Sequence, residues 1–258
     1  PHLGSTLQIG FSERLAEATL TPVAHQFRRG DMARSGQGAP LTPLFHQHQF
    51  ARDTEKIGIL NLGGIANLTL LIPGKPTTGW DIGPANTLSD LWFKLHEDEG
   101  FDRDGRYASS GDVNNQLLNL LIDDPYFKLK PPKSTGREYF NLGWLHTKLG
   151  TMRSIAPQHV QATLNCLTAT LIHQSLPKDL DILAVCGGGV HNNHLMDQID
   201  DLVESLVVTT DVFSVDPDYV EAACFGWLAL QNLDSISSDL RSITGANASG
   251  IIGSLVRP

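Results

Sequence analysis

Apolar residues gather in short blocks along this chain, and the spacing inside each block predicts its structure. The run "KIGILNLGGIANLTLLI", residues 56–72, is apolar and broken in its middle by Gly63 and Gly64. It is too glycine-rich for a helix, so it predicts a strand, a tight turn and a second strand, which together form a hairpin. A short strand ending near Asp81 should follow.

Helical spacing appears next in three segments. "NTLSDLWFKLH" carries Leu88, Leu91, Trp92 and Leu95 on one side, and "DVNNQLLNLLIDDPYF" is helical until Pro125. Pro157 suits a first helical turn and opens an amphipathic stretch over 157–176.

A proline-bearing loop, "KPPKSTGREYF", lies between these segments. In it Thr135 and Glu138 have the spacing of a capping box, which predicts that this loop leads into a helix.

The second half alternates strands with helices. "DILAVC" predicts a buried strand, "GGGVHNN" a glycine-rich turn, and "HLMDQIDDLVESL" a helix; "VVTT" and "PDYVEAACFGWLAL" then repeat the strand and the helix. The tail "SITGANASGIIG" is too rich in small residues for a strong helix. The order is a β-hairpin followed by α/β alternation, so we expect an α/β fold.

Composition narrows the function classes. The chain has 258 residues, a net charge of -9 and no basic stripe, which disfavours nucleic acid as a partner. No apolar run approaches the roughly 20 residues of a membrane helix, and no secretory signal is evident, so we expect a cytoplasmic protein. The three cysteines are widely spaced, and we expect buried, reduced thiols.

Two glycine-rich turns and two acids are candidates for chemistry. Gly63–Gly64 and Gly187–Gly189 could bring backbone N–H groups close to phosphate, although a glycine turn can also be a tight connection only. Asp81 could cap the helix that follows it, and Glu221 could be a favourable charge in a first helical turn. Alternatively, the two acids form a pair in which one is a general base and the other positions a water.

One further pair is weaker. His46 and His48 have HxH spacing, but no third ligand is evident near them, so we read them as a loop pair rather than a metal site.

The motifs "LQIG", "FRRGDMA", "GQGAPLTPLFH", "NLGGIANLTLL", "GWDIGPANTLSD", "PPKSTGREYFN", "VQATLNCLTA" and "CGGGVHNNHLM" occur in this order. Together they resemble the anhydro-N-acetylmuramic acid kinase family of peptidoglycan recycling. The resemblance covers almost the whole chain. It implies an actin-like (ribonuclease H-like) ATPase fold that uses ATP and Mg²⁺, acts on 1,6-anhydro-N-acetylmuramic acid, and forms a homodimer.

The resemblance also implies a division of the chain. Residues 1–44 would be a remnant of the N-terminal lobe, residues 45–232 the C-terminal lobe, and residues 233–258 a segment that returns to the first lobe. The chain begins without methionine and lacks a first phosphate loop, so we expect it to be part of a longer protein. Expressed alone, it should bind nucleotide weakly and show no turnover.

Site roles follow from the same resemblance. Asp81 matches the family's catalytic acid, the general base for water attacking C1 of the sugar, and Glu221 resembles its partner in holding that water. The remaining positions fall into two groups: Gly63, Gly64 and Asn67 with Gly187, Gly188, Gly189 and Asn192 would face the nucleotide, and Asn86, Thr135 and Glu138 would face the sugar.

The chain departs from the family pattern at Ile82, Ala85, Thr87, Gln26 and Gly30. Two alternatives therefore stay open. One is an inactive fragment or a nucleotide- or muropeptide-binding protein of the same fold, and the other is a different sugar kinase of the superfold.

Overall fold

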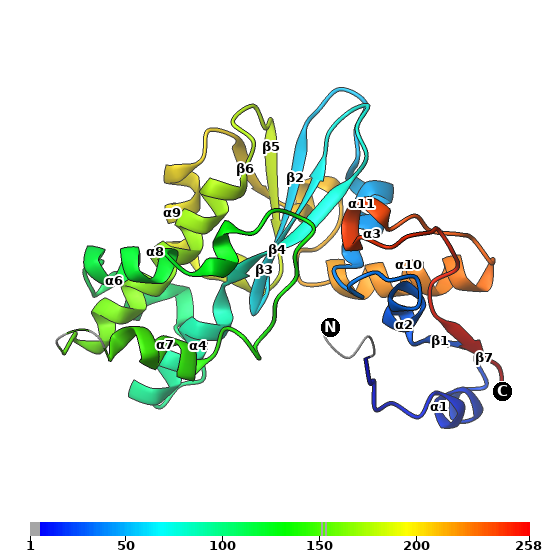
Figure 1. The fold of residues 1–258 in the computed structure, drawn as a ribbon, viewed down its shortest axis with the longest axis horizontal. Coiled ribbons are helices and arrows are strands. Elements are labelled where there is room, and N and C mark those ends of the chain that lie inside the picture. Colours follow the sequence, from blue (N-terminus) through cyan, green and yellow to red (C-terminus); the bar gives the residue numbers. More distant parts are fainter. Residues whose placement is uncertain (1–5, 151, 153) are drawn as a thin grey trace.

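A five-stranded mixed sheet forms the centre of the molecule (Figure 1). The computed structural model describes residues 6–150, 152 and 154–258. The strands are β2 (Ile57–Leu62), β3 (Ile65–Leu71), β4 (Thr78–Pro84), β5 (Ile182–Cys186) and β6 (Leu206–Thr209), in the spatial order β4-β3-β2-β5-β6. β3 is antiparallel to both β2 and β4, and β5 and β6 are parallel to β2.

One face of the sheet is covered by the helices between β4 and β6. These are α4 (Asn86–His96), η1 (Arg103–Gly105), α5 (Arg106–Ser109), α6 (Asn115–Ile122), η2 (Pro125–Lys128), α7 (Leu142–Leu149), α8 (Pro157–Ser175), η3 (Gly188–His191) and α9 (Asn193–Leu202). Leu60, Leu68 and Val185 point into this face and pack with apolar side chains from α4, α8 and α9. Successive side chains along a strand point to opposite faces of the sheet, so the residues next to these three along their strands face a second core on the other side.

The opposite face is covered by α3 (Thr42–Phe50), η4 (Thr210–Phe213), α10 (Val220–Leu233) and α11 (Arg241–Thr244) (Figure 1). The sheet contributes apolar side chains to this second core, among them Ile57, Ile59 and Ala184.

Two strands near the two ends of the described chain pair with each other. After α1 (Ser12–Thr19), β1 (Val23–His25) pairs antiparallel with β7 (Ser254–Val256), and α2 (Phe27–Met32) follows. The fully buried Asp31 accepts hydrogen bonds from Gly38 N and Thr244 Oγ1, each at 2.7 Å. The division at 44/45 and 232/233 stays a prediction; α3 spans the first of these boundaries.

Most of the predicted elements are confirmed, including the hairpin of β2 and β3, the helix that starts at Pro157 and the α/β alternation. The capping box is wrong: residues 133–136 are extended loop, and Asn141 caps α7 by accepting from Trp144 N at 3.1 Å. Asp81 caps nothing, because β4 continues to Pro84 and Ala85 precedes α4 without a side-chain cap.

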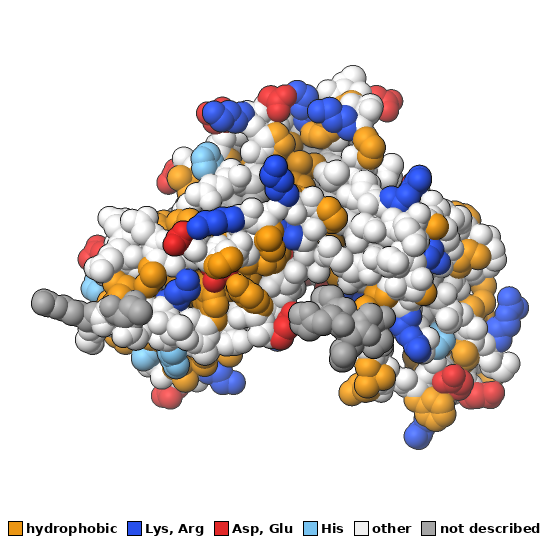
Figure 2. Space-filling view, viewed as in Figure 1, with side chains coloured by type: hydrophobic (Ala, Val, Ile, Leu, Met, Phe, Trp, Pro, Cys, Tyr) orange, Lys and Arg blue, Asp and Glu red, His pale blue; other side chains and the backbone are white. Residues whose placement is uncertain are grey.

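The histidine pair lies on a helix rather than in a loop, since α3 contains both His46 and His48. Cys186 and Cys224 are buried free thiols, and burial raises the pKa of each to about 12, whereas Cys166 is only half-buried. In Figure 2, charges of both signs are scattered over the visible face. Among the described residues, no helix is both long and apolar enough to cross a bilayer.

Candidate active site

A row of polar residues crosses the sheet on the face of the second core. Asp81 of β4 pairs with Asn67 of β3, Asn67 pairs with Asn61 of β2, and Asn61 pairs with Cys186 of β5. Residues paired directly across neighbouring strands point to the same face of the sheet. These four side chains therefore form a row across that face, next to the apolar residues of the second core. The buried Asn67 Oδ1 has no hydrogen-bond partner.

Asp81 is fixed by the segment that ends at Thr135. Its N–H donates to Lys133 O at 3.1 Å, its carbonyl accepts from Tyr126 Oη at 2.7 Å, and its Oδ2 accepts from Thr135 N at 3.0 Å. No hydrogen bond is recorded from the described residues to Oδ1. One carboxylate oxygen is therefore held by the loop, and the second is available to a substrate or a water.

Burial makes Asp81 a stronger base than an ordinary aspartate. The residue is 7 % exposed, and burial raises its pKa to about 6. The bond from Thr135 N, Arg28 and Lys133 oppose this rise, and Glu138 adds to it. A carboxylate with a pKa near 6 is still mostly ionised at pH 7 and takes up a proton more readily than one near 4.

A cavity of about 300 Å³ lies beside Asp81. Thr135 and Glu138 line it together with Arg28, Gln37 and Ser134. The structure thus brings together three of the predicted residues, Asp81, Thr135 and Glu138, and adds Arg28 as a cation.

The two glycine turns meet at a second, smaller cavity of about 170 Å³. It is lined by Gly63, Gly187 and Gly188, with Asn61, Asp218 and Glu221 supplying oxygen atoms. Gly187 has a φ of +84°, and its N–H donates to Pro217 O at 2.9 Å. A side chain there would collide with Asn61 and Leu62, so glycine is required where β5 meets the turn.

His46 closes the inner end of this smaller cavity. It is fully buried, and its Nδ1 lies 2.8 Å from Thr69 Oγ1 while Nε2 has no partner. Burial lowers the pKa of His46 to about 3, so the ring is neutral. No cluster of three or more His, Cys, Asp or Glu side chains suited to a metal was found among the described residues.

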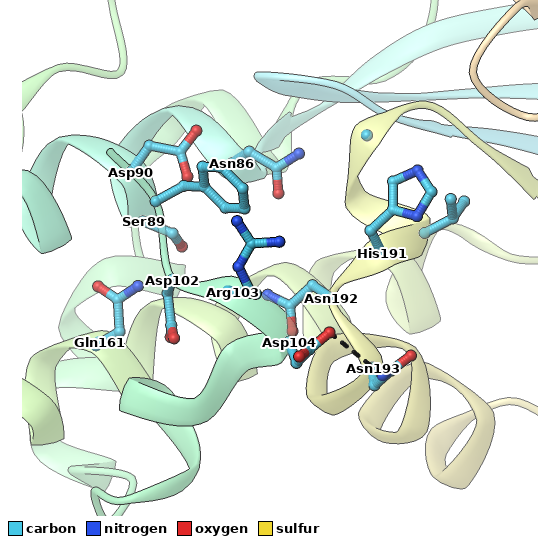
Figure 3. Close-up of a pocket in the computed structure, with 13 residues that line it drawn as sticks. Asn86, Ser89, Asp90, Asp102, Arg103, Asp104, Gln161, His191, Asn192 and Asn193 are labelled. Atoms are coloured by element: carbon cyan, nitrogen blue, oxygen red, sulfur yellow. Dashed lines mark hydrogen bonds between the residues drawn. The ribbon is translucent and has the colours of Figure 1, made fainter. Parts of the chain in front are cut away.

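A larger cleft, of about 660 Å³, opens on the other side of the second turn (Figure 3). Asn86, Ser89 and Asp90 of α4 and Gln161 of α8 form one wall, and residues 188–193 form the other. Two of the predicted residues serve the fold as well: Asn86 Nδ2 donates to Leu62 O at 3.0 Å, and Asn192 Oδ1 accepts from Leu195 N at 3.0 Å to cap α9.

Asp81 and Glu221 come from different elements, β4 and α10. Glu221 lines the smaller cavity, whereas Asp81 is held by Thr135, which lines the cavity of about 300 Å³. Glu221 is exposed at the start of α10 and lies beside the glycine turns instead. The water shared by the two acids stays a prediction.

Two residues of interest were missed in the sequence. Arg137 lies over the first turn, because a Cβ placed on Gly64 would be 3.2 Å from its Nη2 and 3.3 Å from its Nε. Gln161 is fully buried at the cleft wall, and neither of its amide atoms has a partner. Arg137 could have been found as the basic residue of the motif "STGREYF". Gln161 could not, because in the sequence it resembles any other polar residue of a helix.

Two of the family departures do not face this site. Ile82 and Ala85 are buried in the core under α4 and α8, so they alter packing rather than the cavity beside Thr135.

Comparison with known proteins gives the family. A model of the family "Anhydro-N-acetylmuramic acid kinase" matches residues 1–258. Two similar curated relatives carry that same name. The one from Pseudomonas syringae pv. tomato is 44% identical over 99% of this chain and 71% of its own length, and the one from Pasteurella multocida is 45% identical over 98% and 69%. A solved structure, the activator of the 2-hydroxyisocaproyl-CoA dehydratase from Clostridium difficile with bound ADPNP, is 12% identical with a TM-score of 0.42 over 77% of this chain and 69% of that one.

The sheet is mixed α/β with glycine turns after its central strands, which agrees with the actin-like fold class implied by the motifs. The family matched over the whole chain is a family of kinases, so the chain belongs to the phosphotransferases. The particular family is equally plain: the chain belongs to the anhydro-N-acetylmuramic acid kinases.

Proposed function

We propose that this protein uses ATP and water to convert 1,6-anhydro-N-acetylmuramic acid to N-acetylmuramic acid 6-phosphate in peptidoglycan recycling. The observation that carries this proposal is Asp81, a buried carboxylate with one oxygen held by Thr135 N and a pKa raised to about 6, beside a cavity large enough for part of a sugar. Family membership supplies the reaction class.

Asp81 would act as general base through its Oδ1. Water gives a proton to this oxygen and attacks C1 of the sugar, the C1–O6 bond breaks, and O6 takes the γ-phosphoryl group of ATP. The net change consumes one water and one ATP and yields the sugar phosphate, ADP and a proton. Arg28 and Glu138, which line the cavity, would bind the sugar's polar groups.

The nucleotide would lie across the two glycine turns. Gly63, Gly64 and Asn67 belong to the first turn and the strand after it, and Gly187, Gly188 and Gly189 to the second, where backbone groups can approach phosphates closely. Arg137, lying over Gly64, would face the transferred phosphoryl group, where a cation stabilises developing charge.

The oxygen donors of the smaller cavity fit Mg²⁺, which prefers oxygen ligands and keeps several waters. Asn61, Asp218 and Glu221 would hold the ion, which when bound would neutralise charge on the phosphates. The position of Glu221 beside Gly187 favours a role on this phosphate side rather than at the water near Asp81.

Turnover tests the proposal directly. Formation of the 6-phosphate is measured in a chain that spans the whole length of the curated relatives, with ATP and either the anhydro sugar or N-acetylglucosamine. Product from the anhydro sugar alone supports the proposal. Product from N-acetylglucosamine would indicate another sugar kinase, and nucleotide or sugar binding without product would indicate a binding protein. The homodimer and the cytoplasmic location also stay proposals, and sedimentation would test the first.

A further inference from the structure

The wall of the 660 Å³ cleft contains a side-chain amide that makes no hydrogen bond within the fold. Gln161 is 0 % exposed on α8, yet its Oε1 and Nε2 have no hydrogen-bond partner. A buried donor and acceptor without partners are unfavourable, and native proteins rarely retain them without a reason. One turn further along the helix, Asn165 Nδ2 is also unpartnered, while its Oδ1 accepts from Ser89 Oγ at 3.3 Å.

The surroundings of Gln161 suit a flat, neutral ring. Figure 3 shows Gln161 beside Asp102 on one wall and His191 with Asn192 on the other. Phe101, 51 % exposed, and Val190 add apolar surface that can contact a ring face.

The charges of this cleft argue against a triphosphate in it. Asp90, Asp102 and Asp104 line it and Arg103 is the single Lys or Arg among its lining residues, so a base and ribose hydroxyls fit better than phosphates. The phosphates have their own place, since Gly188 lines both this cleft and the smaller cavity where the glycine turns meet. A nucleotide running past Gly188 would put its base into the larger cleft.

We propose that Gln161 recognises the 6-amino edge of the adenine ring and so sets the enzyme's preference for the base of its nucleotide. The amide oxygen accepts from the 6-amino group and the amide N–H donates to a ring nitrogen beside it, the bidentate pairing that glutamine makes with adenine elsewhere. This inference rests on the proposed function, because it requires a nucleotide in the cleft.

The experiment compares ATP with purine riboside triphosphate, which lacks the 6-amino group, by calorimetric titration of the protein. In the wild type, ATP should bind about tenfold more tightly, since the analogue loses the hydrogen bond from the 6-amino group and leaves the buried Gln161 Oε1 without a partner. In Gln161→Leu this ratio should fall to near one. Gln158→Leu is the matched control, because Gln158 lies on the same helix but outside the cleft and should keep the wild-type ratio.

Gln161→Glu provides a second variant should the leucine variant fail to fold as judged by circular dichroism. A carboxylate still accepts from the amino group but cannot donate to the ring nitrogen, which both nucleotides have, so both should bind more weakly while ATP keeps its advantage. A wild-type ratio in folded Gln161→Leu, unchanged affinity for the analogue in folded Gln161→Glu, or equal binding of the two nucleotides to the wild type overturns the proposal. Binding of neither nucleotide by the wild type would instead contradict the proposed function.

Discussion

Replacing Gly187 with alanine tests whether the second glycine turn is shaped by backbone constraint. Gly187 has a φ of +84°, and an added Cβ would collide with Asn61 Oδ1 and lie 3.1 Å from the carbonyl carbon and oxygen of Leu62. The Asn61 side chain could move aside, but the close contact with the β2 backbone at Leu62 cannot be relieved by a side-chain rotation.

The size of the effect follows from two contributions. With its ψ at 168°, Gly187 lies in a backbone region used almost only by glycine, which costs another residue about 1 to 3 kcal/mol. The contact with Leu62 forces a shift in a packed strand, which adds about 1 kcal/mol. We therefore expect Gly187→Ala to lower the free energy of unfolding by about 2 to 4 kcal/mol, which for a chain of this size lowers Tm by roughly 4 to 16 °C.

Gly188→Ala is the matched control for stability. A Cβ on Gly188 meets nothing within 4 Å, and its φ lies outside the left-handed region, so its Tm should stay close to that of the wild type. Both variants are compared by thermal unfolding monitored by circular dichroism. If Gly187→Ala is as stable as Gly188→Ala, the steric account of this turn is wrong.

Three further predictions concern titration and metal dependence. The value of kcat/KM should fall below about pH 6 as Asp81 is protonated. Lys133→Met removes a cation that lowers the pKa of Asp81, so the fall in kcat/KM should begin at higher pH, whereas Lys130→Met should leave it unchanged. Glu221→Gln should raise the Mg²⁺ concentration for half-maximal rate and spare kcat at saturating Mg²⁺; a kcat loss as large as that of Asp81→Asn would place Glu221 at the water. Because the folded-state pKa of His46 is depressed to about 3, the free energy of unfolding should decline as pH falls below 6.5, by up to about 1.4 kcal/mol per pH unit. His46→Asn should make this decline, measured by denaturant titration, less steep. An unchanged slope would contradict a buried neutral ring.

Local patterns predicted much of this fold. Gly63 and Gly64 inside an apolar run located the β2–β3 hairpin, and Pro157 located the start of α8. Each of these signals depends only on residues that are close together in the chain, so it can be recognised from the sequence alone. The capping-box spacing of Thr135 and Glu138 misled because the Thr135 N–H is used by Asp81, which is 54 residues away.

The candidate site was predictable only in part. Asp81 and the glycine turns stand out by residue type and motif. Their grouping into three cavities depends on strand register and on how α8 and α10 pack, which short-range patterns do not contain. Gln161 shows the limit most clearly, because its importance comes from burial without partners rather than from its place in any motif.

The most direct test of the central claim is the turnover of Asp81→Asn in the active kinase, measured beside its affinity for the anhydro sugar without ATP. Asparagine keeps the volume and can still accept from Thr135 N, so sugar affinity should stay near the wild-type value while kcat falls by about 10² to 10⁴. Asp81→Asn retaining more than about half of the wild-type kcat, against that expected range, would contradict the assignment of Asp81 as the general base.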